Sequence, residues 1–152
     1  MADEMEKDSV NYIYQTEIRE GHLDTFGHVN NAVYLTLLEE ARWDLMHKNG
    51  FGLEIIKKSP FGPVILEVNV KYLAELRNRD KVFIYTSIPK EYVGMTVGNI
   101  YQEIYCLGEN EENSENKKKC TEAIYKVGVM DLVRRKLIRP PVEWLNALGL
   151  TQ

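Results

Sequence analysis

The sequence predicts an α+β domain, and three observations lead to that prediction. One long amphipathic helix follows a first strand, and four further segments show strand patterns. The connections between those segments are short, which is typical of an antiparallel sheet. Such a sheet must bury one apolar face, and the long helix is the element that can cover it. We therefore expect a five-stranded antiparallel sheet wrapped around one long central helix.

Length and composition favour one soluble globular domain spanning residues 1–152. Hydrophobic residues make up 44% of the chain and charged residues 28%, and no apolar run is long enough to cross a bilayer. With 19 basic against 23 acidic residues, the net charge of -4 provides no broad surface for nucleic acid. We therefore expect a protein that acts neither in a membrane nor on nucleic acid.

The N-terminal segment MADEMEKDSV is acidic and lacks the basic-then-apolar order of a secretory signal. From this we expect a cytoplasmic protein, with residues 1–8 disordered. Cys106 and Cys120 lie on segments expected to form neighbouring strands. In a cytoplasmic chain such a pair is more often two buried thiols than a disulfide.

Alternating apolar and polar residues locate the strands. The expected strands are residues 10–19, 64–72, 81–88, 96–107 and 120–130. The fourth is long enough for Gly98 to mark a bend or bulge within it. Residues 108–118 read as a polar hairpin loop, and residues 131–152 as a basic tail with a short helix over 142–148.

The long helix begins after Asn30 or Asn31, either of which can act as its N-cap, and ends near Asn49-Gly50. Its apolar residues recur with the spacing of one buried stripe. That stripe comprises Val33, Tyr34, Leu37, Leu38, Ala41 and Leu45. A second, mixed flank carries Leu35, Glu39, Arg42, Trp43 and Met46, and a flank of this kind favours a subunit interface. We expect a homodimer or homotetramer.

The turn before this helix concentrates residues that carry chemistry. Asp24 supplies a carboxylate, His28 an imidazole, and the helix N-terminus a set of unpaired N–H donors that attract oxyanions. Asp24 with Gly27 is also the pattern of an ordinary type I turn. His28 is equally consistent with a general base and with a side chain that holds the turn. The histidines are too scattered and the cysteines too few for a recognisable zinc site.

The order of elements and one motif resemble a known family. The motif is Asp24-x-Phe26-Gly27-His28-Val29-Asn30-Asn31-x-x-Tyr34, followed by Glu39-x-Ala41-Arg42. It resembles the hotdog-fold acyl-CoA thioesterases of the 4-hydroxybenzoyl-CoA thioesterase-like group. The resemblance implies hydrolysis of an acyl-CoA to the free acid and coenzyme A, without a metal or other cofactor.

The resemblance also implies roles for individual residues. Asp24 would act as general base or as nucleophile, the Asn31 backbone N–H would polarise the thioester carbonyl, and His28 would be a second candidate. Gly27 would let the backbone approach the ligand. Further candidates for substrate binding are Asn30, Tyr34, Glu39 and Arg42. Tyr34 is equally a core residue, and Glu39 with Arg42 has the i, i+3 spacing of a surface ion pair.

Four basic residues are candidates for binding the phosphates of coenzyme A: Lys71, Arg77, Arg79 and Lys81. Solvated surface charge is their alternative role. Two alternatives to the acyl-CoA thioesterase also stay open. Acyl carrier protein thioesterases share a related motif, but there an asparagine stands where this chain has Phe26. A hotdog module that binds acyl-CoA without hydrolysing it is the other alternative, and such a module would not need the Asp24 carboxylate.

Overall fold

The computed structural model of the chain describes residues 8–108 and 111–151. Residues 1–7 lie outside this range, so the disorder expected over residues 1–8 stays a prediction for them. Asp8 is described, and its carboxylate lies 3.1 Å from Lys90 Nζ.

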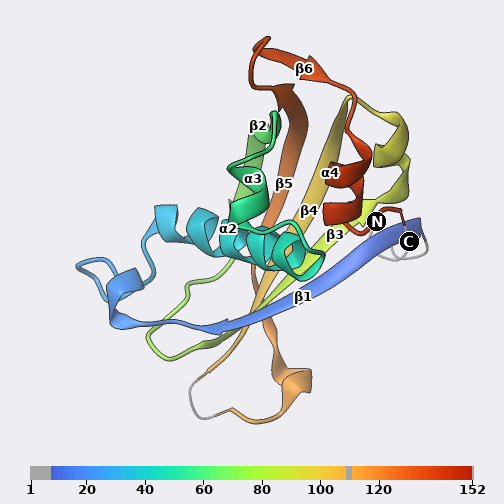
Figure 1. Cartoon of the computed structure of the whole chain (residues 1–152). Helices are drawn as coiled ribbons and strands as arrows, with labels where there is room; N and C mark the ends of the chain where they lie inside the picture. Colours follow the sequence, from blue (N-terminus) through green and yellow to red (C-terminus); the bar gives the residue numbers. More distant parts are fainter. Residues whose placement is uncertain (1–7, 109–110, 152) are drawn as a thin grey trace.

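Five long antiparallel strands and one short strand form a single sheet (Figure 1). They are β1 (Ser9–Glu17), β2 (Phe61–Tyr72), β3 (Lys81–Pro89), β4 (Val97–Leu107), β5 (Lys118–Asp131) and β6 (Lys136–Ile138). The long strands have the order β1-β3-β4-β5-β2. β6 pairs with β5 on the side away from β2, beyond the Val97 end of β4. The edges of the main sheet are therefore β1 and β2, and the predicted α+β class is confirmed.

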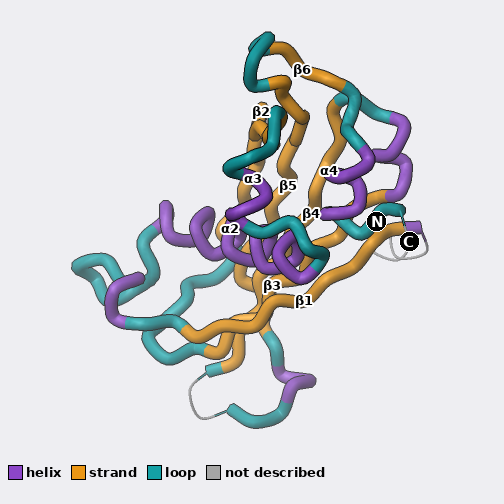
Figure 2. The backbone as a smooth tube through the Cα atoms, viewed as in Figure 1, coloured by secondary structure: helices purple, strands orange, loops and turns teal. Residues whose placement is uncertain are grey.

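The helix α2 (Asn31–Lys48) lies across one face of this sheet (Figure 2). Most of the predicted stripe is buried, and the buried residues of α2 are Tyr34, Leu37, Leu38, Ala41, Leu45 and Met46. Val33 is only half-buried. Met46 was expected on the mixed flank but is 4% exposed, because it packs toward the C-terminal helix and the cavity described below.

The remaining helices are short, and α4 among them extends the core at the end of α2. They are α3 (Leu53–Ile56), α4 (Val142–Ala147), η2 (Glu20–His22), η3 (Lys90–Gly94) and η4 (Ser114–Asn116). The indole of Trp144 in α4 packs edge-on against Phe51, with ring centroids 6.1 Å apart. The predicted helix over 142–148 is thus confirmed in type and place. Cys106 and Cys120 are buried free thiols, as expected.

Several details of the strands differ from the sequence-based expectation. β6 lies in the tail over residues 131–152, where only a short helix was expected. β2 begins at Phe61 and includes Pro63, which an edge strand tolerates because one side of its backbone is unpaired. Gly98 is not at a bulge: the irregularities lie between Ile65 and Glu67 and between Ile104 and Tyr105. A Cβ at Gly98 would lie 1.6 Å from the Tyr92 ring, so this glycine makes room for an aromatic side chain.

We predict that Gly98→Ala lowers the free energy of unfolding by about 1 to 3 kcal/mol, because the added methyl overpacks the buried Tyr92 ring. Gly94→Ala is the matched control, since no atom lies within 4 Å of its added Cβ. It should change stability by less than about 0.5 kcal/mol. Urea denaturation followed by circular dichroism measures both, and equal stability of the two variants would contradict the prediction.

Candidate active site

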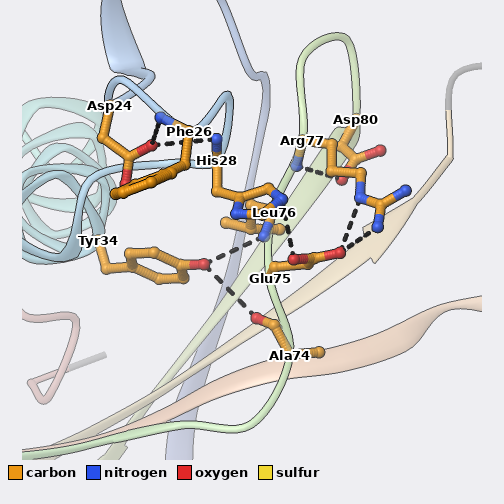
Figure 3. A network of polar contacts seen from close by, with 9 residues as sticks. All are labelled: Asp24, Phe26, His28, Tyr34, Ala74, Glu75, Leu76, Arg77 and Asp80. Carbon is orange, nitrogen blue, oxygen red and sulfur yellow. Dashed lines mark hydrogen bonds and ion pairs between the residues drawn. The ribbon is translucent and has the colours of Figure 1, made fainter.

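The segment between η2 and α2 is held as a tight turn by Asp24. Asp24 Oδ1 accepts hydrogen bonds from the backbone N–H groups of Phe26 at 2.8 Å and His28 at 3.3 Å (Figure 3). The Asp24 N–H donates to the His28 carbonyl at 2.8 Å, and Gly27 has a positive φ of 81° that suits glycine. Asp24 Oδ2 makes no hydrogen bond to any residue that the structure describes. One carboxylate oxygen therefore braces the turn and the other stays available.

The N-terminus of α2 follows this turn directly. Asn30 is the N-cap, and its side chain accepts a hydrogen bond from the Ala32 N–H at 2.9 Å. The Asn30 N–H donates to the His22 carbonyl at 3.0 Å, which ties the helix start to η2. Among the described residues, no acceptor is bonded to the Asn31 N–H. A free donor thus stands at the positive end of the helix dipole.

His28 has a partner that the sequence did not indicate. Its Nε2 lies 3.0 Å from Glu75 Oε2, and Arg77 binds the other oxygen of that carboxylate (Figure 3). The Arg77 hydrogen bond holds the pKa of Glu75 below its usual value. His28 also bridges to Arg77 through the backbone. The imidazole therefore fastens the turn to the connection between β2 and β3, as the holding role proposed for it requires.

The Tyr34 hydroxyl fastens the same connection from inside the core. It accepts a hydrogen bond from the Leu76 N–H at 3.1 Å and lies 3.5 Å from the Ala74 carbonyl oxygen. Burial raises the pKa of Tyr34. The Tyr34 and Tyr72 rings pack edge to face, with their centroids 5.1 Å apart. The Tyr72 hydroxyl donates to the Asn31 carbonyl at 3.1 Å. Tyr34 is thus a buried structural residue, and Tyr72 borders the helix start.

Glu39 and Arg42 do not form the ion pair that their spacing allows. No such pair occurs among the residues that the structure describes, because Arg42 turns toward the sheet. Its Nη1 donates to Gln102 at 2.7 Å, and its guanidinium lies 4.0 Å from the centroid of the Tyr125 ring. Glu39 instead accepts a hydrogen bond from Trp43 Nε1 at 3.2 Å. Both residues line a cavity beside α2.

The four basic residues considered for coenzyme A do not form one cluster. Lys71 Nζ lies 3.4 Å from Glu122, its neighbour across the sheet. Arg79 binds Glu17 and Glu20 at 3.0 and 2.6 Å, and Arg77 binds Glu75. Lys81 is exposed at the start of β3. Their role in phosphate binding stays a prediction.

Within residues 8–108 and 111–151, no group of three or more histidine, cysteine, aspartate or glutamate side chains is arranged to hold a metal ion. In the same part of the chain, no helix has the length and apolarity needed to cross a membrane.

Comparison with known families identifies the group to which this turn and helix belong. A model of the family described as "Thioesterase-like superfamily" matches residues 18–148, which include every predicted site residue. The chain belongs to the thioesterase-like superfamily. This membership confirms the family resemblance inferred from the motif.

Two known thioesterases are similar to part of this chain. The long-chain acyl-CoA thioesterase FadM of Escherichia coli (strain K12) is 40% identical over 58 residues, which are 38% of this chain and 43% of FadM. The acyl-acyl carrier protein thioesterase ATL2, chloroplastic, of Arabidopsis thaliana is 32% identical over 89 residues, which are 59% of this chain and 45% of ATL2. The matched region thus spans less than half the length of each relative.

Solved structures of other proteins share the fold over most of both chains. YbaW Probable Thioesterase from Escherichia coli has a TM-score of 0.72 and 24% identity, over 91% of this chain and 96% of YbaW. SAV2348 from Staphylococcus aureus, in complex with CoA, has a TM-score of 0.75 and 12% identity, over 93% of this chain and 84% of SAV2348. At these identities the likeness establishes the fold, which is the predicted hotdog fold.

We predict that Tyr34→Phe lowers the free energy of unfolding by about 1 to 3 kcal/mol, because it leaves the buried Leu76 N–H without an acceptor. Tyr14→Phe is the control, since the Tyr14 hydroxyl makes no hydrogen bond to a described residue and its ring is half-buried on β1. Denaturant titration of both variants tests the difference. Equal losses would show that the Tyr34 hydroxyl does not hold the loop.

Proposed function

We propose that this chain hydrolyses the thioester of an acyl-CoA at the junction of the turn and α2. The observation that carries the proposal is the pairing of the Asp24 carboxylate, with one oxygen free of hydrogen bonds to described residues, and the unbonded Asn31 N–H. A thiolate is a fair leaving group, so thioester hydrolysis needs an activated water or a covalent intermediate, and a donor for the carbonyl oxygen. Asp24 and the helix N-terminus supply both parts.

Two routes use the same groups. As a general base, Asp24 takes a proton from water while that water adds to the thioester carbon, and the Asn31 N–H stabilises the oxyanion. The oxyanion then collapses, the C–S bond breaks, and the proton held by Asp24 passes to the departing thiolate of coenzyme A. As a nucleophile, Asp24 itself adds to that carbon and expels the thiolate of coenzyme A, which leaves an anhydride for water to cleave. Either route uses the carboxylate of Asp24.

The relatives differ in the thiol carrier for which they are named. FadM is named for acyl-CoA, whereas ATL2 is named for acyl carrier protein, and ATL2 matches more of this chain. Acyl carrier protein is therefore the second candidate carrier. Presenting one acyl group on each carrier and comparing kcat/KM separates them. We place the reaction in the cytoplasm as part of the proposal.

We predict that Asp24→Asn lowers kcat for acyl-CoA hydrolysis by at least about 100-fold. The amide keeps an oxygen that can accept the Phe26 and His28 N–H bonds, so the turn should persist while the base or nucleophile is lost. Release of free coenzyme A, detected with a thiol reagent, measures the rate.

Asp131→Asn is a matched control for this substitution. Asp131 Oδ1 accepts N–H bonds from Val133 and Arg134 at 2.9 and 2.8 Å, so it braces a turn as Asp24 does, but between β5 and β6. Its variant should retain wild-type turnover. Wild-type turnover by folded Asp24→Asn would refute the catalytic role. Saturable acyl-CoA binding without thiol release by the wild type would favour the binding module.

We also propose that two copies pair through the β2 edge. β2 leaves one side of its backbone unpaired and exposes several apolar side chains, and native proteins rarely leave a long apolar edge open. Exposed examples are Ile65, Leu66, Val68, Tyr72 and Leu73. The homodimer or homotetramer predicted from the sequence would cover this edge.

We predict a solution mass of twice the 17.6 kDa of one chain, or a larger even multiple. Leu66→Lys should shift that mass toward one chain at micromolar concentration, because a charge at the interface must be desolvated. Leu132→Lys is the control: both leucines are 45% exposed, but Leu132 lies in the turn after β5. Light scattering after gel filtration gives the masses. A monomeric wild type would contradict this pairing.

A further inference from the structure

The two cysteines of the chain lie on neighbouring strands with their sulfur atoms in contact. Cys106 is the penultimate residue of β4, and Cys120 is the third residue of β5. Both thiols are free, and their sulfur atoms are 2.8 Å apart. This separation exceeds the length of a disulfide bond by less than about 1 Å. Joining the two sulfurs therefore needs only a small movement.

An irregularity in the pairing of β4 with β5 lies at this contact. Tyr105 pairs with Lys119, and the next pair uses Thr121, so the register skips Cys120. A bulge of this kind often re-aims a side chain. The Cys120 side chain is fully buried, whereas Cys106 is 8% exposed. The two sulfurs thus meet inside the domain, with Cys106 nearer to solvent.

The two sulfur atoms differ in their chemical environment. The Cys120 thiol lies within hydrogen-bonding distance of the Cys106 sulfur and of the Lys118 carbonyl oxygen, which is 3.3 Å away. The hydrogen bond from Cys120 lowers the pKa of Cys106, while the same bond and burial raise the pKa of Cys120. The thiolate is the reactive form of a cysteine. Cys106 is therefore the sulfur that reacts first with an oxidant.

The backbone of Cys120 holds the connection between β2 and β3. Its carbonyl accepts hydrogen bonds from the Leu73 N–H at 2.9 Å and from the Ala74 N–H at 3.2 Å. The same connection carries the Leu76 N–H, which donates to the Tyr34 hydroxyl (Figure 3). Backbone hydrogen bonds extend to about 3.2 Å, so a small displacement of the Cys120 carbonyl weakens the bond to Ala74. A movement at Cys120 thus reaches the residues that fasten the turn before α2.

We propose that Cys106 and Cys120 are a redox modification site, at which a peroxide forms a reversible disulfide that loosens the connection between β2 and β3. Formation of the disulfide is independent of the function of the protein. Its effect on hydrolysis rests on the thioesterase function proposed above. Cytoplasmic disulfides are usually transient and redox-sensing, because cellular thiols reduce them.

With hydrogen peroxide the oxidation takes two steps. The Cys106 thiolate adds to one peroxide oxygen, the O–O bond breaks, and the sulfur loses two electrons to the peroxide. This step gives a sulfenic acid and hydroxide, and the hydroxide takes up the proton released by the Cys106 thiol. The Cys120 sulfur then adds to the Cys106 sulfur, the S–O bond breaks, and the Cys120 thiol proton leaves with the hydroxide as a second water. A dithiol reverses the modification by thiol–disulfide exchange.

Counting free thiols in the whole chain tests the modification itself. The reduced protein has two thiols, and stoichiometric hydrogen peroxide should lower the count to zero with the loss of two hydrogen atoms in mass. Peptide mapping should find Cys106 joined to Cys120 within one chain. Retention of both thiols, sulfinic acid alone, or a bond only between chains would overturn the proposal. The wild type alone decides this test.

Hydrogen exchange tests the loosening without any substrate. In the oxidised protein, the Leu73 and Ala74 amides should exchange at least tenfold faster, because their common acceptor has moved. The Ile84 amide is the reference, since β3 is paired on both sides and the Ile84 side chain is fully buried. It should not exchange faster. Unchanged exchange at Leu73 and Ala74 would overturn the loosening.

Turnover links the disulfide to the proposed active site. A displacement of about 1 Å can cost a catalytic step about 100-fold, so we expect oxidation to lower kcat for acyl-CoA hydrolysis at least tenfold. Dithiothreitol should restore it. Cys106→Ala is the control: it has one thiol, it meets the same peroxide, and its kcat should not fall. An equal loss in this variant would assign the effect to other oxidised residues and overturn the link.

The redox site and the thioesterase function fail in different ways. A disulfide with faster exchange at Leu73 and Ala74, in a protein that hydrolyses no acyl thioester, would support the redox site and remove the thioesterase function. Hydrolysis by a protein whose two thiols survive peroxide would do the reverse.

Discussion

The burial of one stripe of α2 against the sheet is the constraint on which the rest of the structure depends. Each fully buried leucine of the stripe contributes about 1.5 to 3 kcal/mol, so rotating α2 about its axis would cost several such contributions. Leu38 and Ala41 are fully buried and Tyr34 nearly so. Because this burial fixes the rotation of α2 about its axis, the first turn of the helix places the Asn31 N–H beside the preceding turn. The position of the proposed oxyanion donor thus follows from hydrophobic packing.

The Tyr34 hydroxyl joins the packed helix to the neighbouring loops. It bonds to the backbone of the connection that carries Glu75, and Glu75 in turn binds His28. The helix, the turn and the connection between β2 and β3 therefore hold one another in place. His28 and Glu75 are about 40% exposed, so their ion pair adds little stability and mainly fixes orientation. Asp24 completes the arrangement with a single carboxylate oxygen.

Much of this arrangement could be predicted from local sequence, and the rest could not for a physical reason. Residues close together in the chain determine the alternation of the strands, the Asn30 cap and the Asp24 turn. Their patterns can therefore be recognised in the sequence. The partner of His28 and the contact of Arg42 with Gln102 join distant segments, and which side chains meet depends on strand register and loop path. The spacing of Glu39 and Arg42 indicated an ion pair. In the structure, Arg42 instead donates to the buried Gln102 amide and lies over the Tyr125 ring, both on the sheet.

The two flanks of α2 differ in a way that local patterns also did not reveal. On the β1 side, Asp44 binds the Tyr12 hydroxyl, and Lys48 lies 3.1 Å from Asp44, so polar contacts close that flank. The Tyr12 hydrogen bond holds the pKa of Asp44 below its usual value, and the flank stays charged at neutral pH. The β2 side carries exposed apolar side chains of β2 and the cavity.

The asymmetry of α2 bears on the proposed pairing of two copies. β2 is a free edge of the sheet, so a second copy paired at that edge would cover the exposed apolar side chains on this flank and shield them from water. Removing this apolar surface from water would stabilise the pair. A ligand that binds only the paired state would stabilise that state further by mass action. The open flank of one helix would thus serve association.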